Sequence, residues 1–300
     1  MTGNTPDTLC LLGCGNLGAA ILDSLLNTSG KKPLFSKFNC CIRSQLSEDK
    51  LKARFSSHLS QLNIWRDRNV EAVLASDVII LGVDPSDIEK VLTEPGIREA
   101  LSSKLLISIA AGWARQTLEE TIYGSKTTKS NVTGRAWVIR TLPNIAAQVS
   151  QSLTAIEMSE PVPPSHYLQI TKAMFDQIGR VVQIPPHLMN ATTAVGGSTP
   201  AFFAVICDAM IDAAVAVGVP RELAHIMISQ SMLGTATMLQ SGIHPALLKD
   251  QGTSPEGCTI GGLMVMEEAG VRGHIGRAVR EAVTLARLME TKSHVNDTRH

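Results

Sequence analysis

The sequence lacks an excess of charge of either sign. Its 300 residues carry 27 basic and 27 acidic side chains, so the formal net charge is zero at pH 7. Nucleic acids and anionic membranes attract proteins largely through positive charge. This balance removes the general electrostatic reason to expect either partner, and we predict no nucleic acid and no membrane.

Long apolar runs and a targeting signal are also missing. A membrane-spanning helix needs about 20 consecutive apolar residues, and charge or proline interrupts the longest apolar stretches of this chain before that length. The start MTGNTPD has neither the basic-then-apolar pattern of a signal peptide nor the Arg-rich character of a transit peptide. We therefore expect a soluble, cytoplasmic protein.

The six cysteines have no spacing typical of a metal site or a disulfide framework. They are Cys10, Cys14, Cys40, Cys41, Cys207 and Cys258. Two of them are adjacent, which suits neither kind of site. We expect buried free thiols and no metal.

Short apolar runs alternate with helical patterns in the first half of the chain. They predict strands at 8–12, 38–42, 77–83, 105–112 and 136–144, helices at 19–26 and 118–123, and a polar surface loop at 124–134. Alternating strands and helices predict an α/β domain with a parallel sheet covered on both faces. We place this Rossmann-type domain at residues 1–184.

The pattern changes after Arg180. Residues 185–290 contain no convincing strand but carry helical patterns at 201–217, 221–240, 245–250, 261–266 and 271–289. Several of these helices are apolar around most of their circumference, which about a hundred residues cannot bury alone. We predict an all-α substrate and dimerisation domain at 185–290, a homodimer, and a polar tail at 291–300.

Three glycines stand between the first predicted strand and the first predicted helix. Gly13, Gly15 and Gly18 have the G-x-G-x-x-G spacing. The first permits a tight turn, the second lets the backbone approach a pyrophosphate, and the third lets helix and strand pack closely. The helix N-terminus adds free N–H donors. This context predicts a dinucleotide site, against the alternative of a glycine-rich turn.

The end of the second predicted strand reads CCIRSQ. A carboxylate here binds the ribose hydroxyls of NAD, whereas a basic residue with a hydroxyl suits the 2′-phosphate of NADP. Arg43 and Ser44 therefore favour NADPH, with NADH as the second choice. The alternative is that Arg43 is an ordinary solvated charge.

Over nearly its full length the chain resembles pyrroline-5-carboxylate reductase. The resemblance is carried by LGCGNLGAAIL, DVIILGVDP, ISIAAG, RTLPN, GGSTPAFF, HPALLKDQGTSPEGCTIGGLMVMEEAGVR and the final AVREAV. It implies a Rossmann domain and a helical domain that interlocks with a partner into a dimer, often assembled further. It also implies NAD(P)H-dependent reduction of a cyclic imine that bears a carboxylate.

The resemblance also assigns site residues. For the cofactor they are Gly13, Gly15, Asn16, Leu17 and Gly18 at the phosphates, Arg43 and Ser44 at the 2′-phosphate, Asn69 near the adenosine, and Val83, Asp84, Pro85, Ala110, Ala111, Gly112 and Asn144 near the nicotinamide half. For the substrate they are Ser198, Glu256, Gly257, Cys258 and Thr259.

Thr259 is the expected catalytic group, with its hydroxyl within reach of the imine nitrogen. Its loop, DQGTSPEGCTIGG, exposes backbone N–H groups just before a helix, which suits an anion such as the substrate carboxylate. The alternative is a glycine-rich connection in which Thr259 merely caps that helix.

Imine reduction places modest demands on the protein. A protonated imine accepts hydride directly, so the main task is to orient two reactants, which can be worth roughly 7 to 11 kcal/mol. A ketone or hydroxyacid dehydrogenase needs a Lys or His acid as well. Residues 181–220 contain neither Lys nor Arg, and their single histidine, His187, precedes the helix. This absence counts against a 3-hydroxyacid dehydrogenase.

The chain departs from the family pattern around the substrate. The family's VKP, PNTP, PGG and KDN read Val83-Asp84-Pro85, Pro143-Asn144-Ile145-Ala146, Pro255-Glu256-Gly257 and Lys249-Asp250-Gln251, and its SGSGPAY or CGSGPAF reads GGSTPAF. A Glu256 carboxylate about 4 Å from a substrate carboxylate would repel it by about 4 kcal/mol at an effective dielectric near 20.

Three hypotheses remain open from the residues. Glu256 faces solvent and the enzyme makes proline, or the substrate is a substituted or six-membered imine of a secondary pathway. The third is a catalytically silent, NADP-binding dimeric scaffold or sensor.

Overall fold

The computed structural model describes residues 7–27 and 33–291, which divide by packing into two compact units. The first unit comprises Met1–Gly197 together with Val283–His300, and the second comprises Ser198–Ala282. The short helical elements after the sheet therefore belong to the first unit, and so do residues 283–291. Of the predicted polar tail, residues 292–300 lie outside the described residues.

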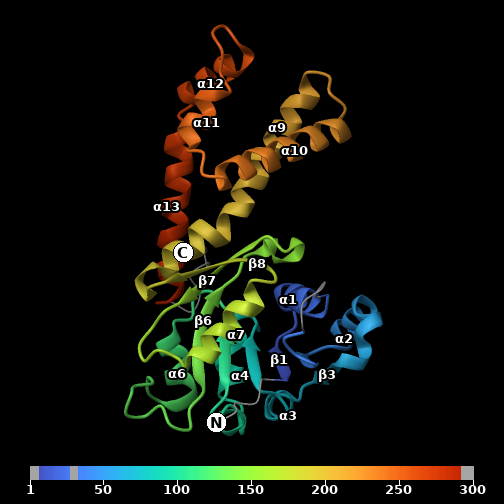
Figure 1. The fold of residues 1–300 in the computed structure, drawn as a ribbon, viewed down its shortest axis with the longest axis vertical. Coiled ribbons are helices and arrows are strands. Elements are labelled where there is room, and N and C mark those ends of the chain that lie inside the picture. The colour runs from blue at the N-terminus through green and yellow to red at the C-terminus, as the bar shows by residue number, and fades with distance from the viewer. Residues whose placement is uncertain (1–6, 28–32, 292–300) are drawn as a thin grey trace, which may run out of the picture. The chain divides into compact units, whose positions relative to one another are not determined.

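An eight-stranded sheet forms the centre of the first unit (Figure 1). Its strands are β1 (Thr8–Leu12), β2 (Lys37–Ile42), β3 (Leu62–Arg66), β4 (Val78–Leu81), β5 (Leu105–Ser108), β6 (Trp137–Leu142), β7 (Ser152–Glu157) and β8 (Gly179–Ile184). They lie in the order β3-β2-β1-β4-β5-β6-β7-β8. The five predicted strands are all present, and those predicted at 77–83, 105–112 and 136–144 are shorter than predicted.

The sheet is parallel from β3 to β6. This confirms the predicted parallel sheet, to which β7 adds an antiparallel pairing with β6, with Thr141 opposite Ile156. A five-residue 3₁₀ turn, η3 (Ile145–Val149), links these strands, and such a short connection allows only an antiparallel return. β8 then pairs parallel with β7.

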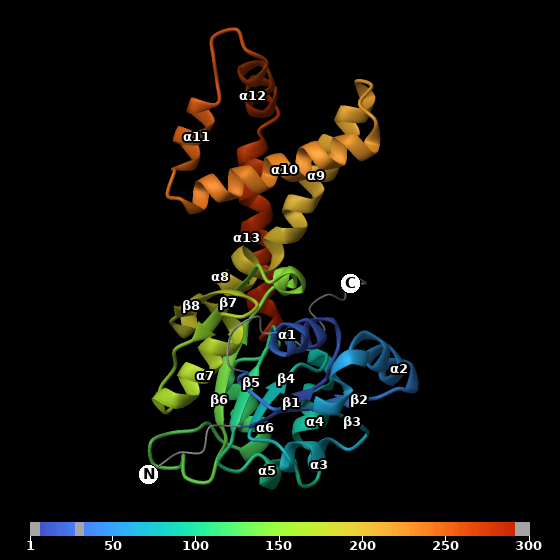
Figure 2. The ribbon, with the colours of Figure 1, turned by 45° about the vertical axis from the view of Figure 1, so that its right-hand side comes forward.

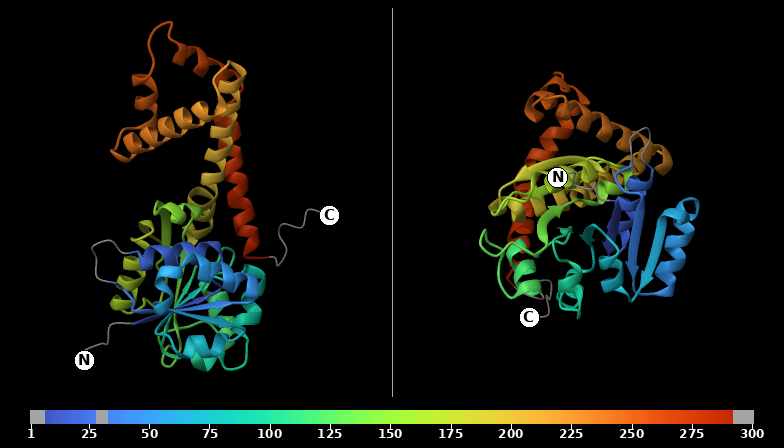
Figure 3. Two further views of the ribbon diagram at one scale, coloured as in Figure 1. Left: turned by 90° about the vertical axis from the view of Figure 1, so that its right-hand side faces the viewer. Right: turned by 60° about the horizontal axis from the view of Figure 1, so that its bottom comes forward.

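Helices cover both faces of the sheet (Figure 3). They are α1 (Asn16–Leu26), α2 (Gln45–Arg54), α3 (Asn69–Leu74), α4 (Ile88–Leu92), α5 (Ile97–Ala100), α6 (Arg115–Tyr123), α7 (Ser165–Phe175) and α8 (Met189–Thr192). Buried side chains of α1, α2 and α7 belong to the core on one face, and those of α3, α4, α5 and α6 to the core on the other. Residues 124–134 form the predicted loop.

The second unit contains helices only (Figure 2). They are α9 (Thr199–Ala216), α10 (Arg221–Gln240), α11 (Pro245–Gln251), α12 (Cys258–Glu268) and the first part of α13 (Val271–Met289). Helix α9 packs on α10, and α10 on α11. Within residues 198–282 only Ile211 and Ala224 are buried. The unit therefore leaves most of its apolar side chains uncovered by its own chain.

One helical segment corrects an expectation from the sequence. Residues Pro186–Ala216 form a continuous run of 31 residues that is long and apolar enough to cross a membrane by length and composition. Between Ala201 and Ala216 only Asp208 and Asp212 carry charge. These two charged residues interrupt the apolar sequence, but the helix continues through them. Because the run is largely exposed within this chain, its apolar surface needs a covering partner.

The cysteines are all free, as predicted, but not all are buried. Cys10, Cys40 and Cys41 are buried, Cys14 and Cys207 are half-buried, and Cys258 is exposed. Burial raises the pKa of Cys10 well above its usual value, and a thiol hydrogen bond with Cys14 together with burial does the same to the pKa of Cys40. These two thiols are poor nucleophiles for that reason.

Candidate functional site

The three motif glycines form the turn between β1 and α1. Gly13 has φ +87°, and a Cβ there would lie 2.6 Å from the Val83 backbone nitrogen. A Cβ on Gly18 would lie 2.9 Å from the Gly13 carbonyl oxygen. These two glycines are required by the fold itself, because backbone atoms occupy the space that a side chain would need.

Gly15 differs from its two neighbours. A Cβ on Gly15 would meet nothing within 4 Å, so the protein leaves this position open. Gly15 is also the N-cap of α1, and no side chain caps that helix. The first N–H groups of an uncapped helix are free donors that attract anions. The residues therefore fit a pyrophosphate that approaches the backbone at Gly15.

A cleft of about 970 Å³ opens at this turn. It lies at the carboxyl ends of β1 and β4, where the strand order reverses, which is the usual ligand position in such sheets. The cleft brings together ten of the residues predicted for the cofactor: Gly13, Gly15, Asn16, Leu17, Gly18, Arg43, Ser44, Asn69, Val83 and Asp84.

The other five predicted cofactor residues lie outside the cleft lining. Pro85 accepts a hydrogen bond from the Trp113 indole at 3.0 Å. Ala110, Ala111 and Gly112 follow β5, and a Cβ on Gly112, at φ +77°, would lie 3.1 Å from Cβ of Met289. Asn144 follows β6 and donates to the Gly196 carbonyl at 2.8 Å. All five follow the carboxyl ends of β4, β5 and β6, so they continue the same edge of the sheet.

Arg43 and Ser44 come directly after β2. Nη1 of Arg43 lies 2.6 Å from Oδ2 of Asp87. The Ser44 hydroxyl caps α2 by accepting a hydrogen bond from the Ser47 N–H at 3.2 Å. Both side chains line the cleft while they serve these local roles.

Asp84 stands where the family has lysine. Hydrogen bonds from the hydroxyl and the backbone N–H of Ser86 lower its pKa below the usual value. It is therefore a carboxylate at neutral pH. Asn69 donates to Oε2 of Glu94 at 2.9 Å on the same cleft.

Sequence reasoning missed several lining residues, Asp87, Lys90, Asp67 and Glu94 among them. Asp87 and Lys90 follow Pro85 on η2 (Pro85–Asp87) and α4. Asp67, at φ +54°, follows β3, a strand that the sequence analysis did not identify. The charged residues of VDPSDIEK, at the end of a predicted strand, were the sequence feature that could have identified Asp87 and Lys90.

The predicted substrate residues lie in the helical unit. Gly257 is the N-cap of α12, with no side-chain capping bond. Thr259 is the second residue of that helix rather than its cap, so the capping alternative is wrong. A Cβ on Gly257 would lie 2.5 Å from the Ser254 hydroxyl oxygen, and Cys258 opens the helix in an exposed position. Ser198 lies at the start of the same unit.

Glu256 occupies a position that favours glycine. Its φ is +59°, the left-handed region that costs a side-chain-bearing residue about 1 kcal/mol or more. The family pattern has glycine here, so the backbone conformation agrees with the pattern although the residue does not. The side chain is exposed within the chain.

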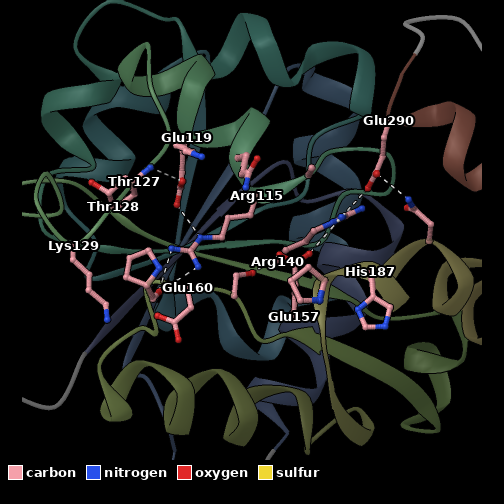
Figure 4. A pocket seen from close by; sticks show the side chains of 17 residues that line it. Arg115, Glu119, Thr127, Thr128, Lys129, Arg140, Glu157, Glu160, His187 and Glu290 are labelled. Carbon is pink, nitrogen blue, oxygen red and sulfur yellow. Dashed lines mark hydrogen bonds and ion pairs between the residues drawn. The ribbon is translucent and has the colours of Figure 1, made fainter.

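A second, charged cavity of about 670 Å³ lies elsewhere in the first unit (Figure 4). The buried Arg140 approaches Glu290 at 2.8 Å and Glu157 at 3.4 Å through Nη1. Within the part of the chain that the structure describes, its Nε and Nη2 have no hydrogen-bond partner. The Asn190 amide holds the other oxygen of Glu290 at 2.8 Å. This cluster attaches the end of the chain to β6.

Replacing Glu290 by glutamine is expected to lower the free energy of unfolding by about 3 kcal/mol, because the buried Arg140 guanidinium then loses a charged partner. Urea denaturation at one fixed protein concentration measures the loss. Glu71→Gln is the matched control, since its pair with Arg68 is 3.0 Å long but exposed and is worth at most about 1 kcal/mol. Equal midpoints for Glu290→Gln and the unmodified protein would contradict this role of Glu290.

The fold, the cofactor cleft and the helical unit together define a class of protein. A mostly parallel sheet with a glycine-lined cleft at its switch point, followed by a helical unit that cannot bury its own surface, is typical of dinucleotide-dependent oxidoreductases that dimerise through helices.

Comparison with protein families agrees with both units. Residues 186–289 match the model for pyrroline-5-carboxylate reductase dimerisation, and residues 8–112 match that for NADP oxidoreductase, coenzyme F420-dependent. The apolar run Pro186–Ala216 falls wholly within the dimerisation match. A second copy of the chain therefore accounts for its uncovered surface.

Whole-chain relatives show the family. A pyrroline-5-carboxylate reductase from Lophium arboricola is 42% identical over 97% of this chain and 96% of its own length, and one from Neurospora crassa is 34% identical over 98% and 96%. The chain belongs to the pyrroline-5-carboxylate reductase family, and it is an NAD(P)H-dependent oxidoreductase that acts on a C=N bond. The crystal structure of Plasmodium falciparum pyrroline carboxylate reductase with NADP bound shares the fold, with a TM-score of 0.78, 24% identity and coverage of 95% and 98%.

Proposed function

We propose that the protein reduces 1-pyrroline-5-carboxylate to proline with NADPH. The observation that carries the proposal is the open position at Gly15, where an uncapped helix start meets a cleft at the switch point of the sheet. The names of the full-length relatives support the substrate. A homodimer, further assembly of dimers and a cytoplasmic location belong to the same proposal.

The first unit holds the cofactor in this proposal. N–H groups of Asn16, Leu17 and Gly18 at the start of α1 bind the pyrophosphate, and Arg43 with Ser44 binds the 2′-phosphate. Asn69 contacts the adenosine, and the segments after β4, β5 and β6 contact the nicotinamide half. When bound, the reduced nicotinamide supplies the hydride that the imine carbon accepts.

The helical unit holds the substrate. The N-terminus of α12, with N–H groups of Cys258 and Thr259 free of side-chain caps, favours an anion such as the substrate carboxylate. The Thr259 hydroxyl donates a hydrogen bond to the lone pair of the unprotonated imine nitrogen and passes its proton to that nitrogen as the imine carbon accepts the hydride. Water then returns a proton to Thr259. Ser198 and Gly257 complete this set, and Glu256 stays in solvent.

The test is NADPH oxidation at 340 nm with 1-pyrroline-5-carboxylate and with its six-membered homologue, for the unmodified protein and Glu256→Gly. We expect turnover of the five-membered imine, changed less than about threefold by Glu256→Gly. The variant should also be about 1 kcal/mol more stable, because glycine relieves the left-handed backbone at this position.

Other outcomes separate the remaining hypotheses. Turnover of the five-membered imine that appears only in Glu256→Gly, or turnover of the homologue alone, would show that the substrate loop has been altered for another imine. NADPH binding without turnover of either compound would support a silent scaffold or sensor.

A further inference from the structure

We infer that Asp87 sets the choice between NADPH and NADH by competing with the 2′-phosphate for Arg43. The inference rests on the proposed function, because it takes the cleft at Gly15 to be the cofactor site. This competition weakens the preference for NADPH that Arg43 and Ser44 suggest.

The geometry begins with the ion pair between these two residues. Oδ2 of Asp87 lies 2.6 Å from Nη1 of Arg43, and both residues line the cleft. The two residues follow different strands. Arg43 comes directly after β2, and Asp87 ends η2, which follows β4. The Arg43 side chain is 75% exposed, so Asp87 is the contact that holds an otherwise solvated guanidinium.

The rest of the cleft lining adds to the effect. Two cations, Arg43 and Lys90, face four carboxylates, those of Asp67, Asp84, Asp87 and Glu94. A 2′-phosphate adds a further charge of about −1.5 to −2. The carboxylates thus disfavour the phosphorylated cofactor, and Arg43 can offset them only in part while Asp87 engages it.

Asp84 adds to the negative charge that disfavours the phosphorylated cofactor. Hydrogen bonds from Ser86 keep it ionised, and the charge of Arg43 contributes to its lowered pKa, so Arg43 acts on both carboxylates of this turn. Asp87 differs from Asp84 in that it contacts the guanidinium directly. Removal of the Asp87 charge should therefore release the donor that a 2′-phosphate needs.

The experiment measures NADP⁺ and NAD⁺ binding by calorimetry, without imine, for the full chain and Asp87→Asn. We expect NADP⁺ affinity to rise about fivefold and NAD⁺ affinity to change less than about twofold, the size typical of an exposed ion pair. High salt should shrink the difference. Asp176→Asn is the matched control, because it removes an exposed carboxylate paired with Lys172 on α7, and it should change neither affinity.

Three results would overturn the inference. A fall in NADP⁺ affinity in Asp87→Asn would make Asp87 a residue that orients Arg43 toward the phosphate, and an unchanged ratio would show that the pair does not reach the cofactor. Because binding is measured without imine, a lack of imine reduction affects only the proposed function. Failure of the unmodified protein to bind either dinucleotide would overturn the assignment of the cleft as well.

Discussion

Replacing Gly15 by alanine is expected to weaken dinucleotide binding at least about a hundredfold while the fold stays intact. A Cβ at this position meets no atom of the protein within 4 Å, so the methyl group enters only the space proposed for the pyrophosphate. It would hold the phosphate away from the first N–H groups of α1, and charge-assisted hydrogen bonds are steeply dependent on distance. Calorimetric titration with NADP⁺ measures the loss.

Gly13→Ala is the matched comparison from the same turn. Its Cβ would lie 2.6 Å from the Val83 nitrogen and 2.7 Å from the Gly82 carbonyl oxygen, at φ +87°. We expect a loss of about 3 kcal/mol or more in unfolding free energy, whereas the melting temperature of Gly15→Ala should stay within about 1 °C of the unmodified protein. Full NADP⁺ affinity in Gly15→Ala would exclude the cleft as the phosphate site.

Replacing Thr259 by valine is expected to lower kcat for imine reduction about a hundredfold. Valine keeps the shape of threonine but cannot donate a hydrogen bond to the imine nitrogen, and a positioned proton donor contributes typically about 10² to 10⁴ in rate. Thr259 lies second in α12, after the Gly257 cap, so the helix has no need of its hydroxyl as a cap. Initial rates of NADPH oxidation at saturating imine give the result.

Thr259→Ser provides the control, because it restores the hydroxyl without the methyl group. We expect it to keep kcat within about tenfold of the unmodified protein. NADP⁺ affinity should be the same in all three proteins, because Thr259 is not among the residues that line the cofactor cleft. If Thr259→Val keeps full kcat, the imine nitrogen obtains its proton elsewhere, and positioning alone carries the reaction.

Elements with strong local patterns were predicted well from the sequence. The buried strands β1, β4 and β5 are short continuous apolar runs, and helix α10 begins and ends at the predicted residues, Arg221 and Gln240. The weaker strands were missed. In β8 no position along Gly179–Ile184 is buried, and β3 mixes Asn63 and Arg66 with apolar residues at the edge of the sheet. Their strand conformation depends on a neighbouring strand rather than on their own composition.

The site residues, like the strands, fall into those that the local sequence indicates and those that depend on contacts between distant parts of the chain. The glycines from Gly13 to Gly18 form one local turn, so their spacing indicated them. Glu256–Thr259 are also adjacent in the chain, but the family resemblance rather than their spacing pointed to them. Asp87 could not be found in this manner, because its contact with Arg43 joins residues 44 positions apart. The pairing of Arg140 with Glu290 likewise joins β6 to the end of the chain.

The sequence by itself determined the class of protein, the order of its two parts and the glycine turn, because these depend on periodicity and on residues close together in the chain. Tertiary structure decided which glycines the fold requires and which one it leaves open, since that depends on backbone atoms of Gly82 and Val83 brought beside the turn. It also decided that Arg43 has a carboxylate for a partner, because only the sheet order places the ends of β2 and β4 on either side of β1.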